Sequence, residues 1–361
     1  MQNVLLSNVF LRSPSAFTSV RFLIMFIFLL ALATRQPSRR SQLLCSRSPE
    51  TPFARVLDCM WLNSRSQFRE DLVLAPTLLA DSVSAAIREP NVCKAADGAS
   101  STDRGHPFRG DFVELGAGDG MTFSNTYIFE MCLWWPGLLI EANKVTYHRL
   151  KHAPRSEIVE RRNSAICTQK GMAQIHGRGG AGIAGLSSHV SILPSNTSQS
   201  LKLPEGSLVS CDSLRSLMAG AGIPNATFLS LDVEGAESIV LHTVDPLAFR
   251  VILVEEQRKH HEKNQQVQAQ LEALGFRQEL GVVGLNRVYL APGVRNFPAP
   301  LGLYNTTYMR WRLGCRVRNS TECTQLRAEF DQCMWHALRS VCAEAARGDD
   351  SPGACVALGA T

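Results

Sequence analysis

Two kinds of hydrophobic pattern alternate along the middle of the chain. Short apolar runs of the kind that form buried strands begin with "DFVEL" at Asp111–Leu115 and recur with "GLLIEA" at Gly137–Ala142. Each run is followed by a segment with helical spacing, the first being "NTYIFEMCLW" at Asn125–Trp134. Further strands of the series are expected within 156–167, 207–222, 226–244 and 249–257. Strands that alternate with helices in this way predict an α/β fold with a mostly parallel sheet.

Other segments flank this series. Apolar residues at helical spacing predict a helix over Ser66–Ile87, with a break near Pro76. The Gly- and Ser-rich stretch 176–200 predicts a loop, and 282–292 predicts a hairpin at the end of the series. We therefore expect four parts: a terminal segment 1–40, a linker 41–65, an α/β domain 66–292 and a helical extension 293–361.

The terminal segment resembles a targeting sequence. Its apolar run, Phe22–Ala33, has twelve residues, which is fewer than the ~20 that a membrane span needs. Arg12 and Arg21 precede the run, and Ala31-Leu32-Ala33 fits a signal-peptide cleavage site. Inclusion of 15–21 would lengthen the run enough for an uncleaved signal anchor. We expect a membrane-anchored or secreted protein of the endoplasmic reticulum or Golgi lumen, with an organelle transit peptide as the alternative.

The net charge of +5 arises largely in this terminal segment, because the first 49 residues contain six arginines and no Asp or Glu. The rest of the composition, 45% hydrophobic and 19% charged, is that of an ordinary globular protein. The charge therefore gives no support to nucleic-acid binding.

Cysteines and glycosylation motifs agree with a secretory route. Five of the eleven cysteines lie in the last 47 residues, without a C-x-x-C pair, so disulfides are favoured over zinc. N-x-S/T motifs begin at Asn196, Asn225, Asn305 and Asn319. Asn225 directly precedes an apolar strand, and we expect it to be too enclosed for modification. The sequence thus predicts a disulfide-bonded glycoprotein.

The turn "ELGAGDG" after the first predicted strand has the character of a nucleotide site. Its glycines, Gly116, Gly118 and Gly120, follow the spacing G-x-G-x-G, whereas the dinucleotide motif is G-x-G-x-x-G. Glu114 at the strand end would repel a phosphate and suit a cationic ligand, which favours S-adenosylmethionine over NAD. Glu141, one βα unit later, is placed to accept hydrogen bonds from ribose hydroxyls, a role common to both cofactors.

These blocks together resemble the FkbM-type S-adenosylmethionine-dependent methyltransferases. The resemblance rests on "FVELGAGDGMTFSNTYIFE", "WWPGLLIEANKVTYHRL", "RRNSAICT", "FLSLDVEGAESIVLHTVD" and "VILVEEQ", in that order, and extends over about 66–291. It implies a Rossmann-like methyltransferase fold with a seven-stranded sheet, S-adenosylmethionine as cofactor, and O-methylation of a hydroxyl or carboxyl. It also implies roles for individual residues toward S-adenosylmethionine, the methyl donor. The methionine part of the donor would be lined by Glu114, Gly116, Gly118 and Asn125, and its ribose would be held by Glu141. Asn163 and Ser164 would lie near its adenine. The cysteine-rich extension lies outside this pattern.

The catalytic candidates follow the later strands. Asp232 and Glu234 lie at the end of the strand in "LSLDVEGAE", where open α/β sheets place catalytic groups. One of them could orient or deprotonate the acceptor hydroxyl while the other caps the next helix. His260 and its neighbour His261 are alternative bases. Asp232, Glu234 and Glu255 could share a Mg²⁺ ion, but we expect no metal because methyl transfer depends chiefly on positioning.

The leading hypothesis is an enzyme that methylates a hydroxyl of a glycan or another polar metabolite. It would be luminal or tethered to a membrane by its terminal segment. One alternative is a non-catalytic binding module built on a degenerate methyltransferase domain. The other is an NAD-dependent oxidoreductase, which the glycine spacing disfavours.

Overall fold

The computed structural model describes 52–88, 110–176, 189–192, 208–256, 260–283 and 285–295, together with single positions between 328 and 339. These residues belong to one compact unit, Ser41–Thr361. The expected targeting segment, the motifs at Asn196, Asn305 and Asn319, and nearly all of the cysteine-rich extension lie outside the described residues. Among the described helices, none is both long and apolar enough to cross a membrane.

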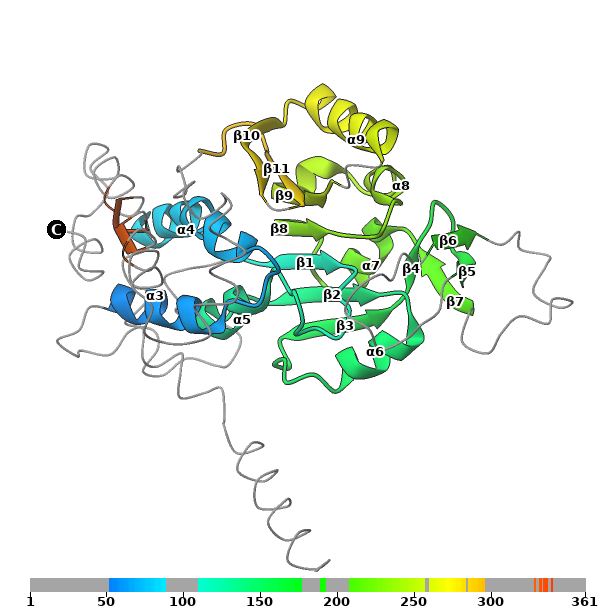
Figure 1. Ribbon diagram of the computed structural model, residues 1–361, viewed down its shortest axis with the longest axis horizontal. Helices are drawn as coiled ribbons and strands as arrows, with labels where there is room; N and C mark the ends of the chain where they lie inside the picture. The colour runs from blue at the N-terminus through cyan, green and yellow to red at the C-terminus, as the bar shows by residue number, and fades with distance from the viewer. Residues whose placement is uncertain are drawn as a thin grey trace, which may run out of the picture. The chain divides into compact units, whose positions relative to one another are not determined.

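A seven-stranded sheet forms the centre of the fold (Figure 1). Its strand order is β10-β11-β9-β8-β1-β2-β3, and within this sheet β11 runs in the direction opposite to the other strands. The strands are β1 (Phe112–Leu115), β2 (Gly137–Glu141), β3 (Val159–Asn163), β8 (Ala226–Leu231), β9 (Phe249–Glu255), β10 (Arg277–Val283) and β11 (Asn286–Leu290). The predicted α/β class and the strand number implied by the resemblance both agree with this sheet.

The order of the strands explains where a ligand would bind. From β1 the chain moves outward to β2 and β3, then returns to the other side of β1 with β8. The direction of strand order therefore reverses at β1 and β8. In open α/β sheets such a switch point leaves a crevice at the carboxyl ends of the strands. Every residue of β1 is buried, as expected for a central parallel strand.

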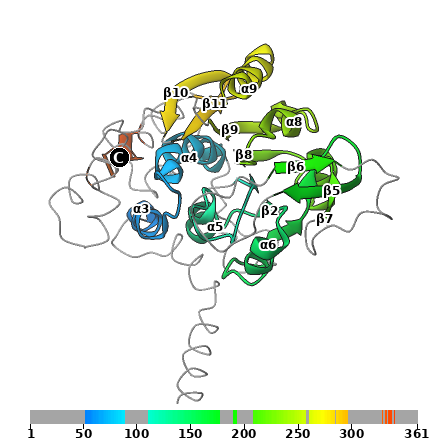
Figure 2. The same ribbon diagram turned by 45° about the vertical axis from the view of Figure 1, so that its right-hand side comes forward.

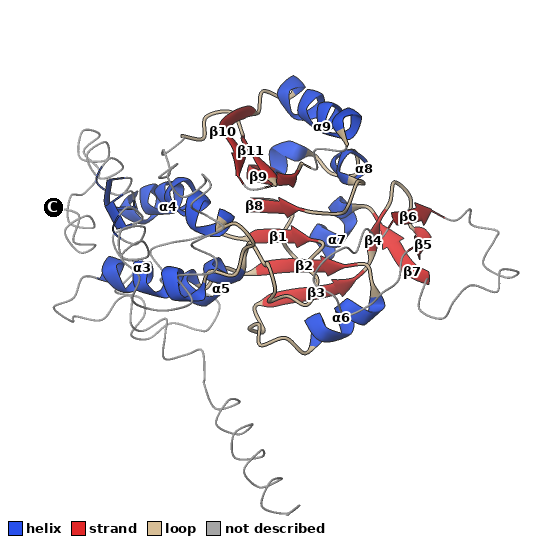
Figure 3. Ribbon diagram, viewed as in Figure 1, coloured by secondary structure: helices blue, strands red, loops and turns tan. Residues whose placement is uncertain are grey.

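Helices cover the sheet (Figure 3). They are α3 (Pro52–Asn63), α4 (Glu70–Arg88), α5 (Tyr127–Leu133), α6 (Lys144–Lys151), α7 (Leu214–Gly220), α8 (Glu237–Leu241) and α9 (His261–Ala273), with a short 3₁₀ turn η2 (Pro246–Ala248). Helix α9 ends near Gly275, whose φ of +84° is the left-handed conformation that glycine adopts without strain.

Helix α3 lies inside the stretch that the sequence predicts to be a linker. It buries Val56, Leu57 and Met60 in the core, and it lies beside α5 (Figure 2). A disulfide between Cys59 and Cys132 joins the two helices. The prediction overlooked these apolar side chains because the surrounding Ser- and Arg-rich residues dominate the composition.

Helix α4 continues through Pro76, so the predicted break is wrong. A proline inside a helix removes one backbone hydrogen bond and costs about 3 kcal/mol. The side chains of 72–79, on both sides of Pro76, are buried, and this packing offsets the cost.

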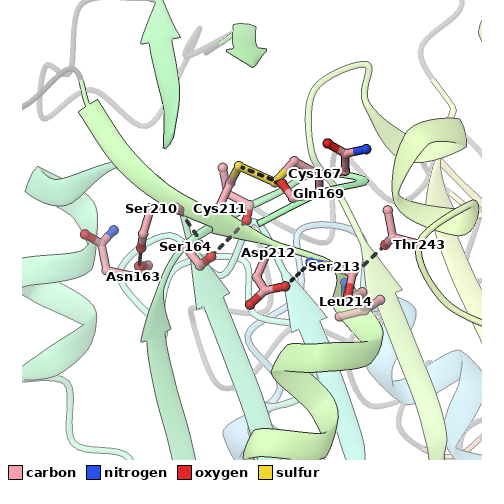
Figure 4. The surroundings of a disulfide bond; sticks show 11 residues. Asn163, Ser164, Cys167, Gln169, Ser210, Cys211, Asp212, Ser213, Leu214 and Thr243 are labelled. Atoms are coloured by element: carbon pink, nitrogen blue, oxygen red, sulfur yellow. Dashed lines mark hydrogen bonds between the residues drawn. A yellow bond between two sulfur atoms is a disulfide. The ribbon is translucent and has the colours of Figure 1, made fainter. Parts of the chain in front are cut away.

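A second, four-stranded sheet follows β3; the sequence predicts the strand within 207–222, but not that this strand belongs to a separate sheet. Its order is β4-β7-β5-β6, with β4 (Ala165–Ile166), β5 (Gly171–His176), β6 (His189–Ile192) and β7 (Leu208–Asp212). A disulfide between Cys167 and Cys211 joins the segment after β4 to β7 (Figure 4). Figure 1 shows this sheet beyond the ends of β1, β2 and β8, where the switch point lies.

Candidate functional site

A cavity of about 500 Å³ opens at the switch point. Its walls come from the glycine turn after β1, the ends of β2 and β8, the second sheet and the segment before α4. The sequence-predicted residues that line it are Glu114, Gly116, Gly118, Asn125, Glu141, Ser164, Asp232 and Glu234. The structure therefore brings eight of the ten predicted site residues together, and Asn163 and His260 are not among the lining residues.

The glycine turn passes very close to the end of β8. Gly116 has a φ of +74°, and a Cβ on this residue would lie 1.8 Å from the carbonyl oxygen of Asp232. At Gly120, with a φ of +76°, a Cβ would lie 2.5 Å from Leu150 Cδ1. Both residues have a left-handed backbone conformation that favours glycine, and at Gly116 the close contact is with backbone, so the spacing of these glycines reflects the conformation and packing of the turn as well as room for a ligand.

Glu114 holds the segment that follows the glycine turn. Its carboxylate accepts hydrogen bonds from Ser124 Oγ at 2.8 Å, Asn125 N at 2.8 Å and Thr126 Oγ1 at 2.6 Å. The side chain lines the cavity but is only 4% exposed. Its negative charge thus acts on a ligand mainly through the electrostatic potential of the site.

Glu141 connects the glycine turn to the end of β2. One oxygen accepts a hydrogen bond from Gly118 N at 2.8 Å, and the other accepts one from Asn143 N at 2.7 Å. Burial raises the pKa of Glu141, although these two backbone donors oppose the rise. Each carboxylate oxygen can accept a further hydrogen bond, so the group can serve a ligand and the turn at once.

Asn125, Ser164 and Asn163 have different surroundings. The amide of Asn125 lies 3.0 Å from Ser230 Oγ at the cavity wall. Ser164 lines the cavity and donates to backbone carbonyls (Figure 4). Asn163 Nδ2 donates to the carbonyl oxygens of Glu141 and Ala142, at 2.8 and 3.0 Å. Asn163 therefore supports the backbone at Glu141.

Three of the carboxylates that line the cavity lie close together. Asp232, Glu234 and Glu255 each offer an oxygen within 4.8 Å of the others. Burial, followed by the negative charges of Glu255 and Glu234, raises the pKa of Asp232 well above its usual range. The group is therefore close enough to share a proton or to hold a divalent cation such as Mg²⁺.

The N-cap position of helix α8 is occupied by Ala236, and not by Asp232 or Glu234 as expected for one of them. Glu237 in the first turn of α8 accepts hydrogen bonds from Val233 N at 3.3 Å and Gly235 N at 3.1 Å. It also forms an ion pair of 2.9 Å with Lys263. Glu234 adopts a φ of +55°, and both it and Asp232 line the cavity.

The histidine candidates lie at the start of α9. His260 is the half-buried residue that precedes the helix, and His261 is exposed in its first turn. Neither is among the described residues that line the cavity.

Sequence reasoning missed several walls of the cavity. Gln67 comes from the segment between α3 and α4, where Ser66 forms a β-bridge with Phe123. Asp71 accepts hydrogen bonds from Ser64 Oγ at 2.6 Å and Arg65 N at 3.2 Å, and these bonds hold the segment that contains Gln67. The closely spaced Ser, Ser and Asp of "SRSQFRED" were a sequence signal for such a polar turn.

Comparison with protein families matches residues 114–278 to the family described as "Methyltransferase FkbM domain". The chain contains an FkbM methyltransferase domain. The match begins at Glu114 and ends at Gln278, so it includes the glycine turn, Glu141 and the three carboxylates, and it confirms the resemblance seen in the sequence over 114–278 of the expected 66–291. Helices α3 and α4 and the Gln67 segment precede the matched residues of this FkbM domain. A search of curated proteins found no match.

Proposed function

We propose that this chain is an S-adenosylmethionine-dependent O-methyltransferase that acts on a hydroxyl of a glycan or another polar metabolite. The charge of the cavity carries the proposal. Among the described residues that line the cavity, the acidic ones outnumber the cationic one, Arg149; the acidic residues are Glu114, Asp119, Glu141, Asp232, Glu234 and Glu255. This charge suits the sulfonium and ammonium groups of S-adenosylmethionine and opposes the pyrophosphate of NAD.

The donor would lie along the glycine turn. Glu141 would accept hydrogen bonds from the ribose hydroxyls with the lone pairs that Gly118 N and Asn143 N leave open. The methionine part would lie toward Gly116 and Asn125, and the adenine toward Ser164 on the side of the second sheet. Asn163 would act on the donor site indirectly, through its hydrogen bond to the backbone carbonyl of Glu141.

The methyl transfer would take place beside Asp232. S-adenosylmethionine would supply the methyl group: the bond from the acceptor oxygen to the methyl carbon would form as the carbon–sulfur bond breaks, with the electron pair of that bond left on sulfur. The products would be S-adenosylhomocysteine and a methyl ether, and Asp232 would take up the acceptor's proton and pass it to water. A carboxylate with a raised pKa is a stronger base in its ionised form, which suits this role. Glu234 and Glu255 would sustain that pKa.

The compartment belongs to the same proposal. The Cys59–Cys132 and Cys167–Cys211 disulfides support an oxidising lumen, since cytosolic thiols are kept reduced. Asn225 is exposed, so the expectation that it is too enclosed for glycosylation is wrong. We place the enzyme in the endoplasmic reticulum or Golgi, secreted or tethered through its terminal segment.

A methyl-transfer assay tests this function. The oxidised full-length protein is incubated with S-adenosylmethionine labelled in the methyl group and with panels of oligosaccharides and polyols, and the Asp232→Asn variant serves as control. Alkali-stable label in an acceptor, absent with the variant, supports an O-methyl ether. Equal label with both proteins counts against Asp232 as the base. Donor binding without transfer to any acceptor favours the non-catalytic module.

A further inference from the structure

A buried arginine outside the cavity is connected to the glycine turn by a closed polar network. Arg155 lies in the loop after α6 and is 6% exposed. Its Nη1 donates to the carbonyl oxygen of Gly120 at 2.8 Å, and its Nε is paired with Glu130, whose side chain is fully buried. Because Gly120 belongs to the turn, Arg155 fixes one end of it directly.

Two hydroxyl groups join Arg155 to Glu114. Ser124 Oγ accepts from Arg155 Nη1 at 3.0 Å and donates to Glu114 Oε2 at 2.8 Å. Thr126 Oγ1 accepts from Arg155 Nη2 at 3.1 Å and donates to the same Glu114 oxygen at 2.6 Å. Each hydroxyl is polarised in the same direction, from guanidinium to carboxylate, so the two bridges reinforce one another. All three partners are at most 4% exposed.

The residue between the two hydroxyls reaches the cavity. Asn125 donates its backbone N–H to Glu114 Oε1 and turns its amide toward Ser230 at the cavity wall. The network therefore holds both Gly120 and Asn125, the two ends of the segment that follows the turn. Arg155 itself does not line the cavity.

The shape of the guanidinium matters as much as its charge. Its carbon lies 5.8 Å from the ring centre of Phe112 and 5.3 Å from that of Tyr127. A planar group with several fixed donors, stacked against aromatic rings, cannot be replaced by the single ammonium of lysine.

We infer that Arg155 is a positioning residue of the donor site, which acts through Ser124 and Thr126 to hold the glycine turn and Asn125 in the geometry that binds the donor. The inference rests on the proposed function for the identity of the ligand. Arg155 contributes no atom to the cavity lining, so its effect on donor binding is indirect.

The test uses the oxidised full-length protein and three variants. Thr126→Val keeps the shape of the side chain and removes its hydrogen bonds to Arg155 and Glu114. Arg155→Lys keeps the positive charge and removes the planar guanidinium group with its several donors. Thr243→Val is the matched control, because Thr243 is also a buried hydroxyl with two hydrogen bonds, to Val240 O and from Leu214 N, outside the cavity lining. Calorimetry gives the affinity for S-adenosylhomocysteine, and hydrogen exchange gives the protection of amides 116–126.

We expect Thr126→Val to weaken S-adenosylhomocysteine binding about five- to tenfold, Arg155→Lys by tenfold or more, and Thr243→Val by less than about twofold at a similar loss of melting temperature. Exchange at 116–126 should become faster in the first two variants alone. If Thr126→Val lowers only the melting temperature, the role is merely structural and the inference fails. If Arg155→Lys does not fold, the result for Thr126→Val still decides whether the network positions the donor site.

The two proposals fail in different ways. Wild-type protein that does not bind S-adenosylhomocysteine contradicts the proposed function, and the exchange measurement then decides alone whether the network holds the turn. Wild-type protein that binds the ligand, with Thr126→Val indistinguishable from it in both measurements, contradicts the positioning role only.

Discussion

Gly116 and Asp232 meet across the switch point, where a Cβ on the glycine would lie 1.8 Å from the aspartate carbonyl oxygen. The turn that lines the donor side and the strand end that carries the candidate base are thus held in direct backbone contact. Asp232 N also donates to the carbonyl oxygen of Leu115, next to Gly116. Any change in this contact should therefore affect stability and the site together.

We predict that Gly116→Ala destabilises the fold by about 2–4 kcal/mol, because a left-handed conformation is combined with a clash against backbone that cannot rotate away. Gly118→Ala is the control: its φ is +56°, but a Cβ there would meet nothing within 4 Å. The control should lose only about 1–2 kcal/mol. Chemical denaturation of both variants measures the difference in the free energy of unfolding. Equal losses would show that the backbone at residue 116 moves away from Asp232 without a free-energy cost.

We predict that Glu141→Gln weakens S-adenosylhomocysteine binding by about 1–3 kcal/mol through loss of charge-assisted hydrogen bonds. The glutamine keeps one acceptor oxygen but turns its NH2 group toward the other backbone donor, Gly118 N or Asn143 N, so the melting temperature should also fall, as expected for one lost buried hydrogen bond. Glu157→Gln, at an exposed position, is the matched control. Unchanged affinity in calorimetry would remove Glu141 from the ribose site.

Much of this site was predictable from sequence because its signals are local. Gly116 and Glu114 lie in one turn, and Glu141 follows one βα unit later. The partners of Glu114 were also nearby, but nothing in the sequence shows that Ser124 and Thr126 turn back toward it.

The remaining walls depend on contacts between distant residues. Cys167 and Cys211 are 44 positions apart, and "GMAQIH" at Gly171–His176 lacks the apolar run of a buried strand. Gln67 reaches the cavity only because Ser66 pairs with Phe123. Pairings of this kind arise from tertiary packing, which periodicity does not encode.

The pH dependence of turnover should report on the carboxylate cluster. Asp232 must be ionised to accept a proton, so activity should fall as the pH drops through its raised pKa. Glu255→Gln removes one of the charges that raise this pKa, and we expect the acid limb of kcat/KM to move to lower pH.

Asp232→Asn should lower turnover by about 10²–10⁴-fold with little change in donor affinity.

The outcomes for the cluster are distinct. An acid limb that stays in place in Glu255→Gln would show that another group titrates. Loss of donor binding in Asp232→Asn would show that Asp232 contacts the methyl donor. Loss of activity when a chelator is added would show that the carboxylate cluster binds a metal ion. Full activity with a lowered melting temperature would place the catalytic centre elsewhere.

Stability should depend on pH through Glu70. This residue is fully buried at the start of α4, where its carboxyl group accepts from Asn286 Nδ2 and Phe68 N, each at 2.7 Å. Burial raises its pKa from 4.5 to about 7. The folded state therefore retains a proton that the unfolded chain loses, and a stabilisation of roughly 3 kcal/mol, complete below about pH 4.5, is lost as the pH rises to about 7.

The variant Glu70→Gln cannot titrate and should lose this dependence. Its melting temperature relative to wild type should rise between pH 5 and about pH 8, whereas Glu157→Gln should follow wild type throughout. Parallel curves for wild type and Glu70→Gln would contradict a protonated Glu70 in the folded state.

We expect the acidic cavity to bind S-adenosylmethionine, and the decisive measurement is calorimetric titration of the oxidised full-length protein with S-adenosylhomocysteine and with NAD. S-adenosylhomocysteine should bind saturably, Glu141→Gln should weaken this binding, Glu157→Gln should leave it unchanged, and NAD should give no heat. Saturable binding of NAD, or no binding of S-adenosylhomocysteine by protein that melts cooperatively, would contradict it.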